Sequence, residues 1–295
     1  DIIAVHLEAG NACVQVYFIR SGQNWGNKDY YPKVGTDLSN SDILQAFVGQ
    51  FYLNRESARL ILLSHEVENK LLMEKLLSER LQQSVNIITP KKGEKRDLVL
   101  DALRNAQESL VQKMAENATQ ITLLNATAKA LGLEKRPNRI EVYDNSHIQG
   151  SHAVGAMIVS GPEGFMRSEY RKFNIRLDEI QNRDDTAMMK HVLSRRFRLG
   201  DKNNQNIDKT NFPDLIILDG GKGQLSSISG ILLESGLGNI PILGIAKGPE
   251  RNSGEETFYL RDNTYLQISR IDPLRDFFQR LRDEAHRFVI GAHRK

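Results

Sequence analysis

The feature of this sequence that most restricts its fold is an order of segments that occurs twice. Each half opens with three extended runs and continues with helical patterns that alternate with short apolar runs. The apolar runs Leu60–Leu63 and Leu215–Leu218 are typical of strands that are buried on both faces. Since 295 residues suffice for two domains of ordinary size, we expect two α/β domains in tandem.

The first half, residues 1–134, ends in a long amphipathic helix. Apolar side chains such as Ile43, Leu44 and Phe47 recur at helical spacing, and the same criterion places the other helices. The segment Lys135–Asn138, which contains a proline, marks the expected domain boundary. The predicted elements are strands at 2–7, 12–19, 29–31, 60–63 and 85–88, and helices at 41–53, 69–82 and 95–131.

The second half, residues 135–295, repeats this order. Three antiparallel strands followed by alternating helices and strands is the order of a ribonuclease H-like mixed sheet, and we predict this α/β fold class for both halves. The halves share almost no sequence identity, so an unrelated α/β fold stays open for the first half. The predicted elements are strands at 140–143, 153–159, 167–173, 215–218 and 242–245, a hairpin through 262–263, and helices at 185–198, 224–235 and 273–293.

Composition indicates a cytoplasmic globular protein. No run approaches the roughly 20 apolar residues of a membrane span, and no signal peptide is visible. The single cysteine, Cys13, excludes an intrachain disulfide and a cysteine-rich zinc site, and its apolar neighbours indicate a core position. The net charge of +3 is too small to indicate nucleic acid by itself. The chain opens at Asp1 and stops at Lys295 directly after a helical pattern, so we expect a fragment of a longer protein.

Two aspartates occupy matching positions in the second half. Asp144 follows the apolar run 140–143, and Asp219 follows the run 215–218. Carboxylates at strand ends can hold Mg²⁺ or Mn²⁺, and such ions support cleavage of a phosphodiester. Either aspartate alone would more often be a turn residue or a helix cap. Their matching positions favour a metal site.

His286 is the third candidate. It lies on the last predicted helix, beside an apolar stripe that includes Phe278 and Leu281. A half-buried helix histidine without chemistry is the alternative. Near a metal site it could act as an acid or base, or as a neutral ligand. His147 and His152 follow Asp144 closely and compete for either role.

The glycine-rich segment Asp219–Gln224 resembles a phosphate-binding turn because it follows a strand and contains Lys222. It lacks the Walker A pattern, so ATP binding is disfavoured. Close approach of the backbone to a nucleic-acid phosphate is the better interpretation. Asp184 and Asp185 precede a helix, and we favour a helix cap over a further metal ligand for them.

Basic residues flank this region and predict contacts to the phosphates of double-stranded DNA, although a solvated surface explains each helix taken alone. No element suggests base reading in the major groove, so we expect binding that is independent of sequence. The predicted DNA-binding residues are Tyr170, Arg171, Lys190, Arg195, Arg196, Lys222, Lys247, Arg282 and Arg287.

Several motifs, in the same order along the chain, resemble the UvrC family, the incision subunits of bacterial nucleotide excision repair. The run Ala12–Arg20 extends the resemblance to the first half. In the second half the matching motifs are Val142–Gly150, Leu218–Leu225, Ile245–Gly248, Arg282–Phe288 and Gly291–Lys295.

The resemblance implies a ribonuclease H-like endonuclease that makes the incision 5′ to a lesion, recruited by UvrA and UvrB. Carried over by position, the catalytic residues are Asp144, Asp219 and His286, with the two aspartates as metal ligands. It also implies parts that this chain lacks: a nuclease for the 3′ cut, a UvrB-binding segment and a helix-hairpin-helix region. We therefore expect 5′-incision chemistry but weak binding of DNA and partners.

Other readings stay open beside this one. A junction or hybrid cutter of the same fold would use three or four carboxylates, whereas two and a histidine are found here. A catalytically silent DNA- or protein-binding module is the other alternative. For the first half we favour such a silent platform, because the residues that follow its matching strands, near His6 or Leu7 and at Ser64, are not aspartates.

Overall fold

The computed structural model of the chain describes residues 1–35, 37–147, 153–175, 184–197, 211–246 and 256–291. The chain divides into two compact units, Asp1–Glu116 and Asn117–Lys295. This division falls within helix α3 (Glu94–Leu131), whereas the sequence analysis placed a boundary after that helix. No helix in the described ranges is long and apolar enough to cross a membrane.

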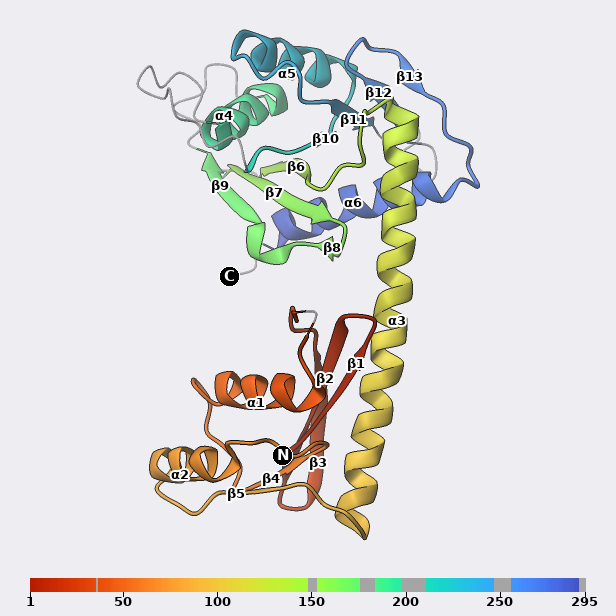
Figure 1. Ribbon diagram of the computed structural model, residues 1–295. Coiled ribbons are helices and arrows are strands. Elements are labelled where there is room, and N and C mark those ends of the chain that lie inside the picture. Colours follow the sequence, from red (N-terminus) through yellow and green to blue (C-terminus); the bar gives the residue numbers. More distant parts are fainter. Residues whose placement is uncertain (36, 148–152, 176–183, 198–210, 247–255, 292–295) are drawn as a thin grey trace. The chain divides into compact units, whose positions relative to one another are not determined.

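The first unit contains a five-stranded sheet in the order β3-β2-β1-β4-β5 (Figure 1). Strands β1, β2 and β3 are antiparallel, while β4 and β5 run parallel to β1. The sheet and its helices comprise β1 (Ile2–Glu8), β2 (Asn11–Arg20), β3 (Gln23–Tyr30), α1 (Asn40–Phe51), β4 (Leu60–Leu63), α2 (Lys70–Leu81) and β5 (Asn86–Ile88), followed by the first part of α3.

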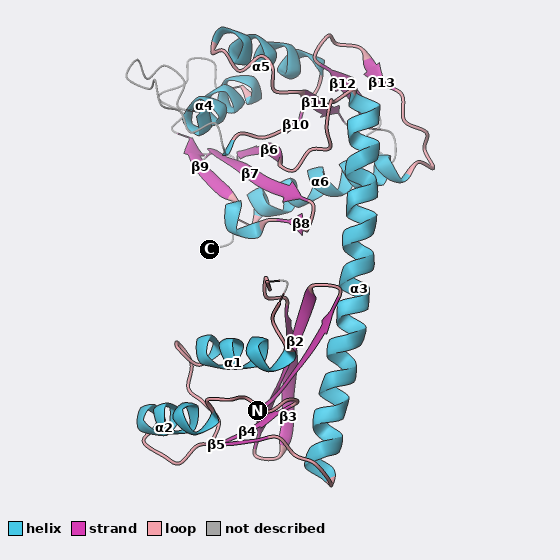
Figure 2. Cartoon of the chain, in the orientation of Figure 1, coloured by secondary structure: helices cyan, strands magenta, loops and turns pink. Residues whose placement is uncertain are grey.

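Helices cover both faces of this sheet, as Figure 2 shows: α1 and α2 lie on one face and α3 on the other. Side chains alternate between the two faces along each strand. Ile3 therefore packs toward α1 and α2, while Ala4 packs toward Val99 and Ala102 of α3. Cys13 is fully buried against α3, and burial raises the pKa of its thiol to about 12, which confirms a core position.

The second unit contains an eight-stranded sheet whose main path is β13-β12-β11-β10-β6-β7-β8, with β9 also paired to β7. Helices α4 and α5 pack on one face of it, and α6 with the end of α3 packs on the other. Its elements are β6 (Ile140–His147), β7 (Ala153–Gly161), β8 (Gly164–Phe165), β9 (Arg171–Ile175), α4 (Asp185–Phe197), β10 (Leu215–Asp219), α5 (Lys222–Glu234), β11 (Ile242–Ala246), β12 (Thr257–Leu260), β13 (Tyr265–Leu266) and α6 (Pro273–Ile290).

The two units share one strand order. The run β9-β7-β6-β10-β11 repeats β3-β2-β1-β4-β5, with the same parallel and antiparallel pairs. This confirms the predicted mixed α/β, ribonuclease H-like fold. The predicted strand 167–173 is wrong at its start, because Arg167–Glu169 forms a short 3-10 helix and the strand begins at Arg171.

Candidate active site

Two neighbouring parallel strands carry the predicted aspartates. Tyr143 pairs with Leu218, so the next residues, Asp144 and Asp219, lie side by side. Asp219, predicted to follow the strand 215–218 directly, is the last residue of β10. The prediction that the other strand ends at Asp144 is wrong, because β6 stays paired with β7 as far as His147. Asp144 instead stands where β6 continues beyond its parallel partner β10.

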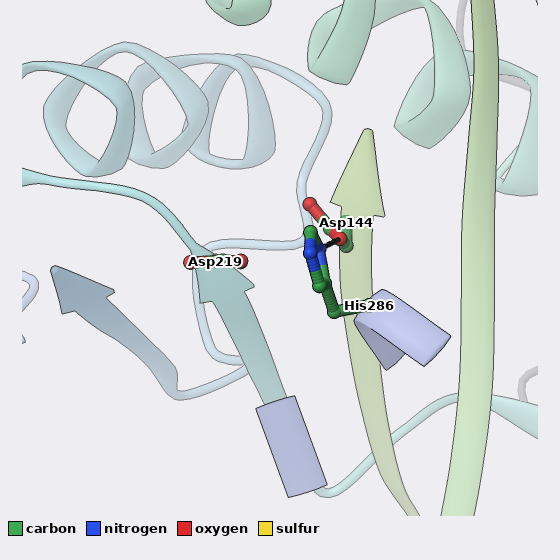
Figure 3. A group of neighbouring side chains, drawn as sticks. All are labelled: Asp144, Asp219 and His286. Atoms are coloured by element: carbon green, nitrogen blue, oxygen red, sulfur yellow. Dashed lines mark hydrogen bonds and ion pairs between the residues drawn. The ribbon is translucent and has the colours of Figure 1, made fainter. Parts of the chain in front are cut away.

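Helix α6 brings His286 to this pair of aspartates (Figure 3). Its Nδ1 atom lies 2.8 Å from Oδ2 of Asp144, and one potential ligand atom from each of the three residues lies within 4.8 Å of the others. Among the residues that the structure describes, no other group of three histidine, cysteine or acidic side chains meets this criterion. The structure thus brings the three predicted residues together, while their roles stay predictions.

Burial differs strongly within the cluster. The Asp144 side chain is 7% exposed, whereas the His286 side chain is 47% exposed. The pKa of Asp144 is raised to about 6, chiefly by burial and then by the neighbouring Asp219 carboxylate, while the contact with His286 opposes the shift. Two carboxylates at a partly buried position repel each other. A cation held between them would relieve this repulsion, so the donor set fits a divalent metal.

The turn after Asp219 is shaped by glycine. A Cβ atom on Gly220 would lie 1.6 Å from Oε1 of Gln224, and one on Gly244 of the adjacent strand would lie 3.0 Å from the Gly220 carbonyl oxygen. A side chain at Gly244 would press on the backbone of the turn, whereas one at Gly220 would displace the flexible end of the Gln224 side chain. Helix α5 begins at Lys222, three residues after Asp219.

The start of α6 is set by two residues. Oδ1 of Asp272 accepts a hydrogen bond from the backbone N–H of Leu274 at 2.9 Å, and Pro273 occupies the first helical position. Both features are typical of a helix N-terminus. From this start the buried face of α6 includes Ala285 and Val289, and His286 lies at its exposed margin.

Other predicted ligands lie elsewhere. Oδ1 of Asp184 accepts a hydrogen bond from the Ala187 N–H at 2.7 Å, so Asp184 caps α4, as expected. His152 and Lys247 lie outside the described residues, as does the side chain of His147.

The predicted DNA-binding residues occupy different environments. Arg196 contacts the fully buried Glu141, and Arg282 is buried against Glu256. Arg195 donates to the Asn174 carbonyl. Arg287 pairs with Glu284, to which the Tyr170 hydroxyl also donates. Of the remaining three, Arg171 and Lys222 are exposed and Lys190 is partly exposed.

Three buried acids that the sequence analysis did not single out organise these basic residues: Glu141, Glu256 and Glu284. Glu284 stands in the run Arg282–Arg287, where charges alternate as on any solvated helix face. Only the packing of Tyr170 and Arg287 around it shows that it is a structural acid.

The first unit has apolar and neutral residues at the positions of the aspartates. Leu63, the last residue of β4, pairs with Ile3, as Leu218 pairs with Tyr143. Ala4 and Ser64 are therefore the counterparts of Asp144 and Asp219. The expectation of His6 or Leu7 at the first position is wrong, because it assumed that β1 ends where the site begins, whereas β1 continues to Glu8.

Among solved structures, the chain is weakly similar to Endonuclease V of Ciona intestinalis, crystallised with a DNA 23-mer that contains inosine. The match has 15% identity and a TM-score of 0.28, and covers 46% of this chain and 58% of that one. A match at this level carries no functional argument.

Curated relatives are much more similar. The UvrABC system protein C of Ruegeria pomeroyi is 52% identical over 294 residues, which is 100% of this chain and 47% of the relative. That of Rhodopseudomonas palustris (strain HaA2) is 49% identical over 304 residues, with 44% of the relative covered. The chain thus spans about half the length of these relatives.

Family models match both units. Residues 1–113 match the UvrC ribonuclease H-like domain, and residues 128–290 match the UvrC ribonuclease H endonuclease domain. The second match covers the three clustered side chains. With its strand order, its site and these relatives in agreement, the chain belongs to the UvrC family.

Proposed function

We propose that the second unit is a divalent-metal-dependent DNA endonuclease that makes the incision 5′ to a lesion in nucleotide excision repair. The observation that carries this proposal is the meeting of Asp144 on β6, Asp219 at the end of β10 and His286 on α6, with one potential ligand atom of each within 4.8 Å of the others. The endonuclease-domain match over residues 128–290 supports the reaction class.

In this proposal Asp144 and Asp219 hold the metal, with Asp144 as the principal ligand. The oxygen donors suit Mg²⁺ or Mn²⁺. A bound divalent ion supplies stabilisation of negative charge and activation of water. Strands β6 and β10 fix the backbone positions of both aspartates. Burial of the Asp144 side chain restricts its movement.

His286 contributes an imidazole whose orientation is held by its contact to Asp144. That contact uses Nδ1, which leaves Nε2 as the nitrogen available to accept or deliver a proton. The 47% exposure of the side chain allows substrate to reach it. We therefore favour a role as acid or base for His286, with direct metal binding as the alternative.

Exposed basic residues would bind the DNA backbone through phosphates, without reading sequence. We retain Arg171, Lys190, Arg195, Lys222 and Arg287 in this proposed surface, together with Tyr170 and Lys247 from the sequence analysis. We leave out Arg196 and Arg282, because buried acids engage their guanidinium groups and both side chains are themselves largely buried, whereas the side chain of Arg287 is 65% exposed despite its pair with Glu284.

The relatives' name supports UvrA and UvrB as the partners that bring this nuclease to a lesion in the cytoplasm. We propose that the first unit is a catalytically silent platform, since Ala4 and Ser64 replace the two aspartates. A platform of this kind would contribute packing or docking and no chemistry.

Nicking of supercoiled plasmid by the chain in Mn²⁺ tests the nuclease. We expect activity in the wild type and its loss in Asp144→Ala, Asp219→Ala and His286→Ala, with folding checked by circular dichroism. Nicking that survives Asp144→Ala would place the site elsewhere.

A substrate comparison separates the proposal from the other ribonuclease H-like activities. The chain should cut duplex DNA in preference to an RNA–DNA hybrid of the same sequence or a four-way junction. A clear preference for the hybrid or the junction would reassign the substrate and leave the catalytic residues unchanged.

A further inference from the structure

Strand pairing in the second unit puts a lysine in line with the metal site. Asp144 of β6 pairs with Ala156 of β7, and Ala156 pairs with Lys172 of β9. Residues that are directly opposite on neighbouring strands point to the same face of a sheet. Asp144 and Lys172 therefore face the same side, with only the methyl group of Ala156 between them.

Helix α6 crosses this row of residues. His286 contacts Asp144, and two residues later Phe288 packs beside Ala156. The ammonium group of Lys172 lies 4.8 Å from the centroid of the Phe288 ring. The same helix thus positions both the imidazole at the site and the aromatic ring under the lysine.

The aromatic support of Lys172 is itself fixed. The Tyr170 ring lies 5.0 Å from the Phe288 ring in an edge-to-face arrangement, and the Tyr170 hydroxyl donates to Glu284. A cation over an aromatic face is held weakly where solvent reaches it. The Phe288 ring therefore orients the Lys172 ammonium group, but the contact is weak enough for this group to bind another partner.

Charge around Lys172 favours an anion. Glu284 is the nearby acid, but Arg287 binds both of its carboxylate oxygens. Within the described part of the chain, Lys172 forms no ion pair with a carboxylate, and it is exposed. This differs from Arg196 and Arg282, whose guanidinium groups neutralise buried acids.

The separation fits a nucleic-acid strand. Two strand spacings amount to about 10 Å between the backbones at Asp144 and Lys172. A DNA strand rises about 3.4 Å per nucleotide along the helix axis, and its phosphates also wind around that axis, so successive phosphates lie farther apart than this rise and the separation spans about one or two nucleotides.

Resting on the proposed nuclease function, we propose that Lys172 binds a backbone phosphate of the cleaved DNA strand, within about two nucleotides of the phosphodiester at Asp144. This residue would fix the position of the strand along the site. It acts by charge and does not read the base.

The test measures binding of the complete 295-residue chain to a fluorescein-labelled DNA duplex by anisotropy, without metal, over a series of salt concentrations. Lys172→Met should weaken binding about tenfold at low salt. It should also reduce the slope of log K against log salt by about 0.9, the value for one lost phosphate contact. Lys172→Arg, which keeps the cation, should retain the wild-type slope.

Lys129→Met is the matched control, because Lys129 is an exposed lysine in the last turn of α3. It should change neither affinity nor slope, and all variants should unfold at the wild-type temperature. A Lys172→Met protein with wild-type affinity and slope overturns the inference. Wild-type binding that lacks salt dependence does so as well.

The nicking assay separates this inference from the nuclease proposal. If Lys172→Met loses the phosphate contact while Asp144→Ala still nicks, the phosphate site stands and the assignment of the catalytic residues fails. If Asp144→Ala abolishes nicking while Lys172→Met binds like the wild type, only the inference about Lys172 fails.

Discussion

The two units of this chain share one order of five strands and differ in the side chains that these strands carry. In the second unit, Asp144 and Asp219 meet on adjacent parallel strands, whereas Ala4 and Ser64 take these positions in the first. The hydroxyl of Ser64 accepts a hydrogen bond from the Val5 N–H, so it satisfies a backbone donor of β1.

The helix that covers this position differs in the same way. In the second unit α6 presents His286 to Asp144. In the first, Val99 and Ala102 of α3 pack on the cluster that contains Ala4. An apolar helix face over an alanine needs no counterion, whereas a buried carboxylate requires a hydrogen-bond or charge partner.

One acid is common to both units, and it is structural. By the same register, Asp1 corresponds to Glu141. Both are buried, both accept a hydrogen bond from a tyrosine hydroxyl, and both pair with arginine. The fold thus keeps its structural acid in each unit, while the paired acids of the proposed metal site are found in the second unit. The strand order that both units share brings the same positions together, and the side chains at these positions determine whether a unit can hold a metal.

The largest expected effect is a difference in plasmid nicking between variants of the second unit and of the first. Asp219→Ala should reduce plasmid nicking by at least about 1000-fold, because removal of a central catalytic group commonly costs this much. The equivalent change in the first unit, Ser64→Ala, should leave the nicking rate unchanged. Loss of nicking in Ser64→Ala, in a protein that is folded by circular dichroism, would show that the first unit takes part in the reaction.

The structural acid of the second unit gives the next effect. Glu141→Gln should lower the free energy of unfolding by about 3 kcal/mol, since it leaves two largely buried arginines without their counterion. Urea denaturation measures it. Glu169→Gln is the control, because Glu169 also pairs with Arg139 but is 39% exposed, and its loss should cost less than about 1 kcal/mol. An equal loss of unfolding free energy in the two variants would contradict the distinction between the buried acid Glu141 and the exposed acid Glu169.

Asp144 should destabilise the metal-free protein, in contrast to Ala4. Its pKa rises from 3.8 to about 6 on folding, so the folded state binds this proton more tightly than the unfolded state. The resulting penalty grows as pH rises from about 4 to 6 and is complete above that. At pH 8 we expect Asp144→Asn to gain about 2 kcal/mol, below the roughly 3 kcal/mol of the full shift, because the contact with His286 is weakened.

Thermal unfolding of both proteins over this pH range measures the effect. The gain should fade as the pH approaches 4. A gain that is independent of pH would mean that the ionisation of Asp144 is not its source.

The smallest effect is the stabilisation by metal. At ten times its dissociation constant, Mn²⁺ should raise the free energy of unfolding by about 1.4 kcal/mol. Removal by a chelator should reverse the shift in melting temperature. Asp144→Asn should abolish the response, while Ser64→Ala should keep it. A full response in Asp144→Asn would place the bound ion outside the proposed site.

Local pattern was sufficient for most of the elements. The run Leu60–Leu63 was predicted with its observed ends, and the strand that leads to Asp219 was predicted one residue short of its observed end. Strand β3 was largely missed, because Gln23–Tyr30 is polar and exposed at the sheet edge. Its pairing depends on the hairpin turn at Ser21 and Gly22, both with positive φ, and alternation of apolar residues gives no sign of it.

The sequence by itself determined which residue types were available for chemistry: two aspartates after apolar strands and a histidine on an amphipathic helix. It could not decide that these residues meet, since His286 stands 142 residues beyond Asp144. Tertiary structure decided that, through the parallel pairing of β6 with β10 and the packing of α6 across the sheet. Tertiary structure also showed that Arg196 and Arg282 neutralise buried acids. The register of β6, β7 and β9 places Lys172 in one row with Asp144.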